Sequence, residues 1–153
     1  MPKMKEMVDD FLAQQRVAVV GVSRSLNKTG DAIYDKFKGH GYEVFPINLH
    51  TREYKGGPCY ASVKDVPGGV QAAMLITSPE ATEQVVRECA EAGVTHVWMH
   101  RSFGNSVSEE AVAFCSEKGI NVIPGACPMM YLEPDFGHVI IKMIGKVAGY
   151  VPR

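Results

Sequence analysis

A polar loop that directly follows a short apolar run is the part of this sequence best suited to hold a ligand. Val17–Val20 is uniformly apolar, Gly21 follows it, and the next residues include Ser23 and the cations Arg24 and Lys28. Glycine permits a tight turn and a close approach of the backbone to a ligand. Free amides at the start of the following helix attract phosphate oxygens. The segment therefore predicts a phosphate-binding loop.

The loops after the later apolar runs offer further polar side chains. In an open parallel sheet, ligands bind beyond the carboxyl ends of the strands, where the strand order reverses. The candidate loops are Asn48-Leu49-His50, Thr77-Ser78-Pro79, His100-Arg101-Ser102 and Pro124-Gly125-Ala126-Cys127-Pro128.

These loops require a particular arrangement of strands and helices. Apolar or β-branched runs predict strands at about 17–20, 42–47, 72–76, 95–99 and 121–123, and amphipathic stretches predict helices at about 30–38, 79–92 and 108–118. Between residues 48 and 69 we expect a looser region with a short strand near Cys59–Tyr60 and a short helix near 62–66. Alternation of this kind indicates βαβ units and a parallel sheet with helices on both faces.

The predicted fold class is therefore α/β, with a doubly wound parallel sheet of the Rossmann-like type. The chain of 153 residues falls within the usual size of one domain. We predict a single domain over 1–153, with an N-terminal helix within 1–15 and a closing helix over 137–148.

Composition and charge exclude several classes of function. The formal net charge is −1, which argues against bulk electrostatic capture of nucleic acid or an anionic membrane. The four cysteines form no C-x-x-C pair and have no metal-ligand spacing with the five histidines, so no metal site is expected. The sequence has no apolar stretch of transmembrane length and no signal-peptide pattern. We expect a cytoplasmic protein that contacts neither nucleic acid nor membrane.

The sequence argues against a site for an unphosphorylated dinucleotide ribose. Such a site uses G-x-G-x-x-G and an acidic residue at the end of the second strand. Here Ser23 replaces the second glycine, and the second strand ends in 47–50 without a carboxylate. His50, Arg52 and Lys55 instead suit a ribose that carries an extra phosphate, although each is also compatible with a solvated loop position.

Three segments together resemble a known family. They are Gly21-Val22-Ser23, the stretch Gly41-Tyr42-Glu43-Val44-Phe45-Pro46-Ile47-Asn48, and Gly125-Ala126-Cys127-Pro128. In order and spacing they are similar to the stand-alone coenzyme A (CoA)-binding domain proteins. They are likewise similar to the N-terminal CoA-binding domain of the succinyl-CoA synthetase α subunit and of ADP-forming acyl-CoA synthetases. The resemblance covers about residues 16–130.

The resemblance implies that the ligand is CoA or an acyl-CoA, and it assigns residues to parts of that ligand. Gly21, Val22, Ser23, Arg24 and Lys28 would hold the diphosphate. Pro46, Asn48 and His50 would lie near the phosphorylated ribose or adenine, Thr77, Ser78 and Pro79 would line the cleft, and Met99, His100 and Arg101 would lie nearby. The family usually has a proline in the first loop and another after the second-strand asparagine, and this sequence has neither.

Three kinds of function remain open on these grounds. The first is a CoA-binding protein without catalytic domains, regulatory or dependent on a partner, because too few residues follow Pro128 for the other synthetase domains. The second is a nucleotide-dependent enzyme, NAD(P) included, with His100 and Arg101 as candidate groups and Cys127 as a thiol able to form a mixed disulfide with CoA. The third is an interaction module, a homodimer included, with a vestigial nucleotide site and an apolar patch of Trp98 and 129–132. Trp98 continues a buried strand and so favours the core, and 129–132 is equally compatible with packing under the last helix.

Overall fold

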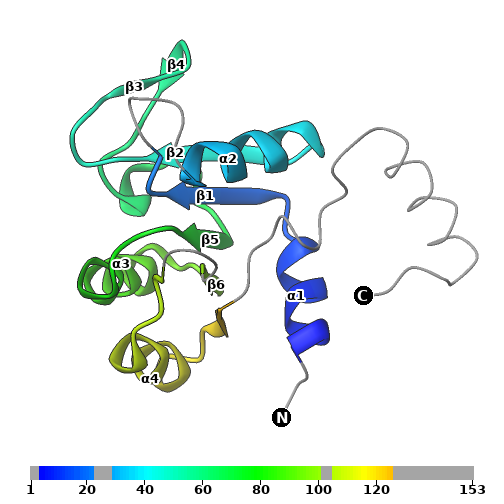
Figure 1. The fold of residues 1–153 in the computed structure, drawn as a ribbon, viewed down its shortest axis with the longest axis vertical. Coiled ribbons are helices and arrows are strands. Elements are labelled where there is room, and N and C mark those ends of the chain that lie inside the picture. Colours follow the sequence, from blue (N-terminus) through cyan, green and yellow to red (C-terminus); the bar gives the residue numbers. More distant parts are fainter. Residues whose placement is uncertain (1–3, 23–28, 101–104, 126–153) are drawn as a thin grey trace, which may run out of the picture.

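A parallel sheet forms the centre of the computed structural model, which describes residues 4–22, 29–100 and 105–125 (Figure 1). Its strands are β1 (Arg16–Val20), β2 (Glu43–Ile47), β5 (Ala72–Leu75), β6 (His96–Met99) and β7 (Asn121–Pro124). They lie in the order β2-β1-β5-β6-β7, and every neighbouring pair is parallel. The chain moves outward from β1 to β2 and then returns to the other side of β1, so the order reverses between β1 and β5.

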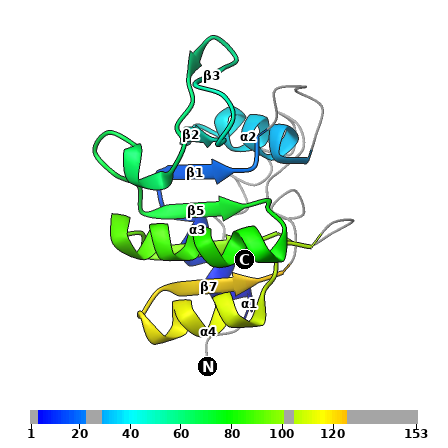
Figure 2. The ribbon, with the colours of Figure 1, turned by 90° about the vertical axis from the view of Figure 1, so that its left-hand side faces the viewer.

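Helices cover both faces of this sheet, as the sequence predicts (Figure 2). On one face, α1 (Met4–Leu12) and α2 (Thr29–Gly39) share a core with Val17 and Val19. On the other, α3 (Pro79–Ala92), α4 (Glu109–Glu117) and the short 3₁₀ helix η1 (Val63–Asp65) share a core with Ala18 and Val20. The doubly wound α/β fold is thereby confirmed.

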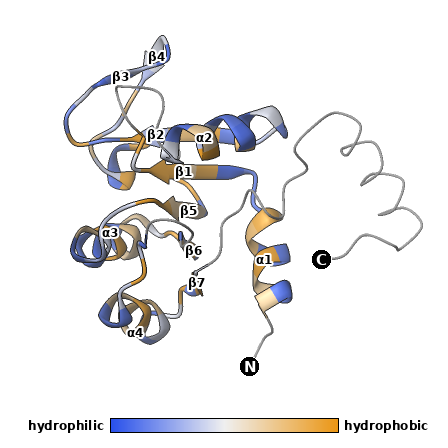
Figure 3. Cartoon of the chain, viewed as in Figure 1, coloured by the Kyte–Doolittle hydropathy of each residue, from blue (hydrophilic) through white to orange (hydrophobic). Residues whose placement is uncertain are grey.

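The uniform apolar character of β1 follows from its position in the middle of the sheet. Its residues alternate between the two cores, and Val17, Ala18 and Val19 are fully buried. Figure 3 shows hydrophobic residues along the central strands and hydrophilic residues on the outer sides of the helices. A strand covered on both faces has no polar side to alternate with, which explains the continuous apolar run.

The helix boundaries follow from capping residues. Ser78 accepts a hydrogen bond from the amide of Ala81 at the start of α3, and Gly93 ends that helix in the left-handed conformation with φ of 80°. Ser108 caps α4 in the same way through the amide of Ala111. Hydroxyl groups satisfy amides that have no partner in the first helical turn.

The region between β2 and β5 contains more structure than the sequence predicts. A hairpin of β3 (Glu53–Tyr54) and β4 (Gly57–Pro58) lies there, and the expected strand at Cys59–Tyr60 is reduced to one parallel bridge from Tyr60 to Ile47. The hairpin strands are only two residues long, too short for an alternating pattern to indicate them.

Trp98 belongs to the core and not to a surface patch. Its side chain is fully buried and packs edge-on against Phe11 of α1, with ring centroids 5.3 Å apart. The interaction-module hypothesis therefore loses Trp98 as an exposed group. Its other residues, 129–132, together with Cys127 and the expected helix over 137–148, lie outside the described residues.

Removal of the Phe11 ring tests whether α1 is an integral part of the core. Phe11→Ala should lower the free energy of unfolding by about 3 kcal/mol, because a buried aromatic ring is lost and a cavity remains. Urea titration measures this change. Met4→Ala, at a position 37% exposed on the same helix, should change the unfolding free energy by less than about 0.5 kcal/mol. Equal effects of the two substitutions would contradict the packing described.

Candidate functional site

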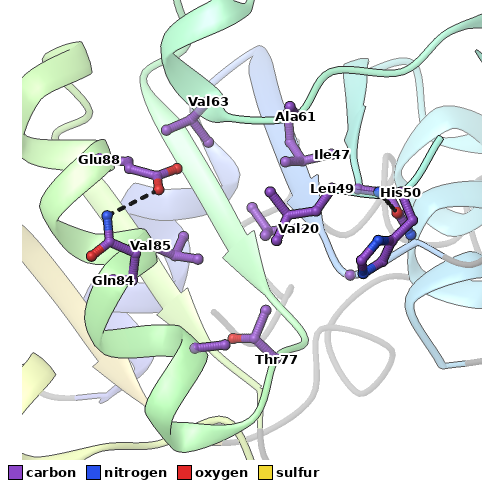
Figure 4. Close-up of a pocket in the computed structure, with 13 residues that line it drawn as sticks. Val20, Ile47, Leu49, His50, Ala61, Val63, Thr77, Gln84, Val85 and Glu88 are labelled. Atoms are coloured by element: carbon purple, nitrogen blue, oxygen red, sulfur yellow. Dashed lines mark hydrogen bonds between the residues drawn. The ribbon is translucent and has the colours of Figure 1, made fainter. Parts of the chain in front are cut away.

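A pocket opens where the strand order reverses, beyond the carboxyl ends of β1, β2 and β5 (Figure 4). Its volume is about 330 Å³, within the range typical of small-molecule sites. Val20, Gly21 and Ile47 contribute from the strand ends, and residues 48–50 form one wall. The general rule for ligand binding in doubly wound sheets therefore identifies this place.

Gly21 is required at the end of β1 by its surroundings. Its φ is +118°, and a Cβ atom there would lie 2.1 Å from the carbonyl oxygen of Ile76. Gly30, in the first turn of α2, is equally crowded, because a Cβ atom there would lie 2.3 Å from the carbonyl oxygen of Gly21. Through this contact the first turn of α2 packs against Gly21, which itself lines the pocket, and an anion site at the helix N-terminus would lie next to that residue.

The sequence predicts a helix start near Gly30 but assigns no packing role to that residue. The signal that could have indicated this role is a second glycine where the loop meets the helix. In nucleotide-binding folds, a glycine at this point permits close packing of the helix on the strand.

Asn48 connects the loops after β1 and β2. Its Nδ2 donates a hydrogen bond to the carbonyl oxygen of Val22 (2.6 Å), and its Oδ1 accepts one from the amide of His50 (2.6 Å). Asn48 and His50 both line the pocket, as does Leu49, whose apolar side chain is 70% exposed at its mouth. The structure thus brings two predicted binding residues, Asn48 and His50, together at one wall.

The opposite wall comes from α3 and was not predicted. Ala81, Gln84, Val85 and Glu88 line it at the three- and four-residue spacing of one helix face. The carboxylate of Glu88 accepts hydrogen bonds from the Ser62 hydroxyl (2.6 Å) and from Nε2 of Gln84 (3.2 Å). The helical spacing is visible in the sequence, but which face of the helix meets the pocket depends on how the helix packs.

Among the three residues predicted after β5, only Thr77 lines the pocket. Its hydroxyl shares a hydrogen bond with that of Thr82 (2.6 Å), and its amide donates to Oγ of Ser106 (2.8 Å). Ser78 and Pro79 form the N-cap and first residue of α3. They therefore position the pocket wall, and ligand contact by either residue stays a prediction.

The remaining predicted residues lie deeper or outside the described ranges. Pro46 is buried in β2, an edge strand, where a residue that cannot donate a hydrogen bond is tolerated. Met99, the last residue of β6, is fully buried in the core that α3 and α4 cover. Neither is among the pocket-lining residues. Ser23, Arg24, Lys28 and Arg101 fall outside the residues that the structure describes.

His100 is buried at the end of β6, with 2% of its surface exposed. Its Nε2 atom has no hydrogen-bond partner within the described part of the chain. Burial lowers the pKa of the imidazole, so the side chain is neutral at neutral pH. A neutral, buried imidazole can accept or donate one further hydrogen bond.

The sequence profile of the CoA binding domain family matches residues 15–133. That span includes every pocket-lining residue named above. The chain belongs to the CoA binding domain family.

Relatives of this CoA-binding domain occur in proteins of very different length. It is 30% identical over 129 residues to the acetate–CoA ligase [ADP-forming] II subunit alpha of Pyrococcus furiosus, covering 79% of this chain and 28% of the relative. It is 27% identical to the uncharacterized protein YneT of Bacillus subtilis, covering 82% of this chain and 91% of the relative. The chain thus spans less than a third of the ligase subunit.

A solved structure shares the same arrangement. A hypothetical protein from Pyrococcus horikoshii OT3 superposes with a TM-score of 0.77 at 25% identity, over 84% of this chain and 89% of that one. Within the described residues, no group of His, Cys, Asp or Glu side chains could hold a metal ion, and no helix could cross a membrane.

Crowding at Gly21 should make substitution there costly. Gly21→Ala should lower the free energy of unfolding by more than about 2 kcal/mol, because the methyl group meets a backbone carbonyl at a strained φ. Gly39→Ala is the matched control, since a Cβ atom at that helical position has nothing within 4 Å. Urea titration should find the control unchanged or slightly more stable. Equal stability of both variants would contradict the close approach.

The buried imidazole of His100 should make stability depend on pH. The folded-state pKa is lowered, so below the unfolded value of about 6.5 the unfolded chain binds more protons. The free energy of unfolding should then fall as the pH drops below about 6.5, by at most about 1.4 kcal/mol per unit. Urea titrations between about pH 5 and 8 measure the slope. His100→Gln should flatten it, and an unchanged slope would contradict the assignment.

Proposed function

We propose that this chain binds CoA or an acyl-CoA in the pocket between β1, β2 and β5. One observation carries the proposal: Gly21 lines a largely apolar pocket and also packs directly against Gly30 in the first turn of α2, where helix amides can bind an anion. CoA combines a diphosphate and a ribose 3′-phosphate with uncharged parts, so it needs both anion-binding groups and an apolar pocket. Membership of the CoA binding domain family supports the same ligand.

In this proposal, the negative and the neutral parts of the ligand bind in different places. The described pocket lining contains one carboxylate, that of Glu88, and neither lysine nor arginine, so phosphate groups would be poorly accommodated in it. We place the diphosphate at the start of α2, held by Gly21, Val22, Ser23, Arg24 and Lys28. The exposed side chain of Leu49 supports apolar contact at the pocket mouth. The phosphorylated ribose would lie outside the apolar lining, on the exposed side of His50.

The proposed role is binding and not catalysis. In the described lining, the hydroxyl of Thr77 pairs with that of Thr82, and Glu88 is occupied by Ser62 and Gln84. This arrangement supplies no nucleophile activated by a base. The related unit makes up 28% of the ligase subunit and 91% of YneT, so it occurs both with and without further domains. A regulatory or partner-dependent role is therefore part of the proposal.

A pocket-filling substitution tests the site. Ala81 is exposed and lines the pocket from α3, whereas Ala113 is exposed on α4 away from it. Ala81→Phe should weaken CoA binding at least about tenfold, by occupying ligand space. Ala113→Phe, the matched control, should bind CoA as the wild type does. Isothermal titration calorimetry measures both affinities.

The same titration tests the ligand. CoA should bind more tightly than 3′-dephospho-CoA if the cationic loops recognise the ribose phosphate. Absence of heat with CoA, equal affinity for both ligands, or equal loss in the two phenylalanine variants would each count against the proposal. Formation of acetyl-CoA from acetate, CoA and ATP by the isolated chain would contradict a non-catalytic role.

A further inference from the structure

Residues 48–62, the segment between β2 and η1, form an excursion that leaves the sheet at the pocket and returns to it there. Residues 48–50 and Ala61 line the pocket at the two ends of this excursion. The amide of Asn48 donates to the carbonyl of Tyr60 (2.9 Å), and the amide of Cys59 donates to that of Arg52 (3.0 Å). The two ends are therefore hydrogen bonded together, and any displacement of the excursion would move one wall of the pocket.

The far end of the excursion is the β3–β4 hairpin (Figure 1), and side-chain contacts fix it to α2. The Tyr54 hydroxyl donates to Oδ1 of Asp31 at 2.6 Å, and Lys55 forms an ion pair with Asp35 at 2.5 Å. The ring of Tyr54 also stands edge-on against that of Tyr34, with centroids 4.9 Å apart. Asp31 lies in the first turn of α2, the turn that the proposed diphosphate site uses.

The hydrogen bond between Tyr54 and Asp31 is the strongest part of this attachment. Asp31 is 1% exposed and Tyr54 is 4% exposed, whereas the Lys55–Asp35 pair is partly solvated, with side chains 28% and 59% exposed. A buried carboxylate needs hydrogen bonds, and bonds to a charged acceptor are stronger than neutral ones. Burial and the nearby Asp31 raise the pKa of Tyr54, so its hydroxyl remains a proton donor.

From these contacts we infer that Tyr54 and Asp31 are positioning residues for the ligand site. Their hydrogen bond fixes the pocket wall formed by the excursion relative to the first turn of α2. The inference rests on the proposed function, because it assigns the pocket and the helix start to two parts of one ligand. When the hydroxyl is lost, the two parts of the site should move independently and the ligand should bind less tightly.

Tyr54→Phe tests the inference, and Tyr42→Phe is its matched control. The Tyr42 hydroxyl also donates a hydrogen bond of 2.6 Å, to the carbonyl of Leu12 in α1, away from the pocket. Tyr54→Phe should weaken CoA binding about tenfold by calorimetry, from the lost bond to a charged group. Tyr42→Phe should leave the affinity within about twofold of wild type. Equal affinities in the two variants would overturn the inference.

Hydrogen exchange of the free protein tests the positioning without a ligand. The amides of Asn48, Cys59 and Tyr60 should exchange faster in Tyr54→Phe than in Tyr42→Phe, because the excursion loses its attachment. If wild-type protein shows no heat with CoA, the proposed function fails, and the exchange data alone decide the positioning role. Unchanged exchange of these amides in Tyr54→Phe overturns it.

Two substitutions of Asp31, the hydrogen-bond acceptor, distinguish a positioning role from a general loss of folding. Asp31→Asn keeps a side-chain oxygen that can accept from Tyr54, so affinity and exchange should remain closer to wild type than in Asp31→Ala. A purely structural role for the carboxylate would instead give parallel losses of stability in both variants with unchanged affinity. That result would overturn the inference.

Discussion

The site depends on the contact of one backbone unit, that of Gly21, with three neighbouring elements. Its amide donates to the carbonyl of Ile47 at the end of β2, its Cα faces the carbonyl of Ile76 after β5, and its own carbonyl meets Gly30 in α2. No side chain fits at these distances. The ends of two strands and the start of one helix therefore converge on a single point, and the pocket opens there.

The two walls of the pocket are held by different means. The α3 wall depends on the helix start at Ser78 and on the bond from Ser62 to Glu88, which connects α3 to the segment before η1. The opposite wall depends on Asn48, whose amide group bonds the loop after β1 to the loop after β2. Each wall is thus held by side-chain hydrogen bonds in addition to the sheet: one joins a loop to a helix, and the other joins two loops.

The distribution of charge agrees with the division of the ligand into two parts. A net charge of −1 gives little general attraction for an anion, so phosphate recognition needs local donors. The start of α2 can supply amides and a favourable dipole, whereas the pocket beside it is largely apolar. A site that joins these two environments suits a ligand that has both anionic and uncharged parts.

The sequence by itself determined the fold class, and it predicted the strand ends beyond which the pocket opens. Uniform apolar runs marked strands covered on both faces, and amphipathic stretches marked the helices between them, because these signals act within a few residues. Tertiary structure alone decided that α3 lines the pocket, that Ser78 and Pro79 start the helix that forms this wall, and that Tyr54 reaches Asp31. Those contacts join residues far apart in the chain, and only the packing of elements across the sheet brings them together.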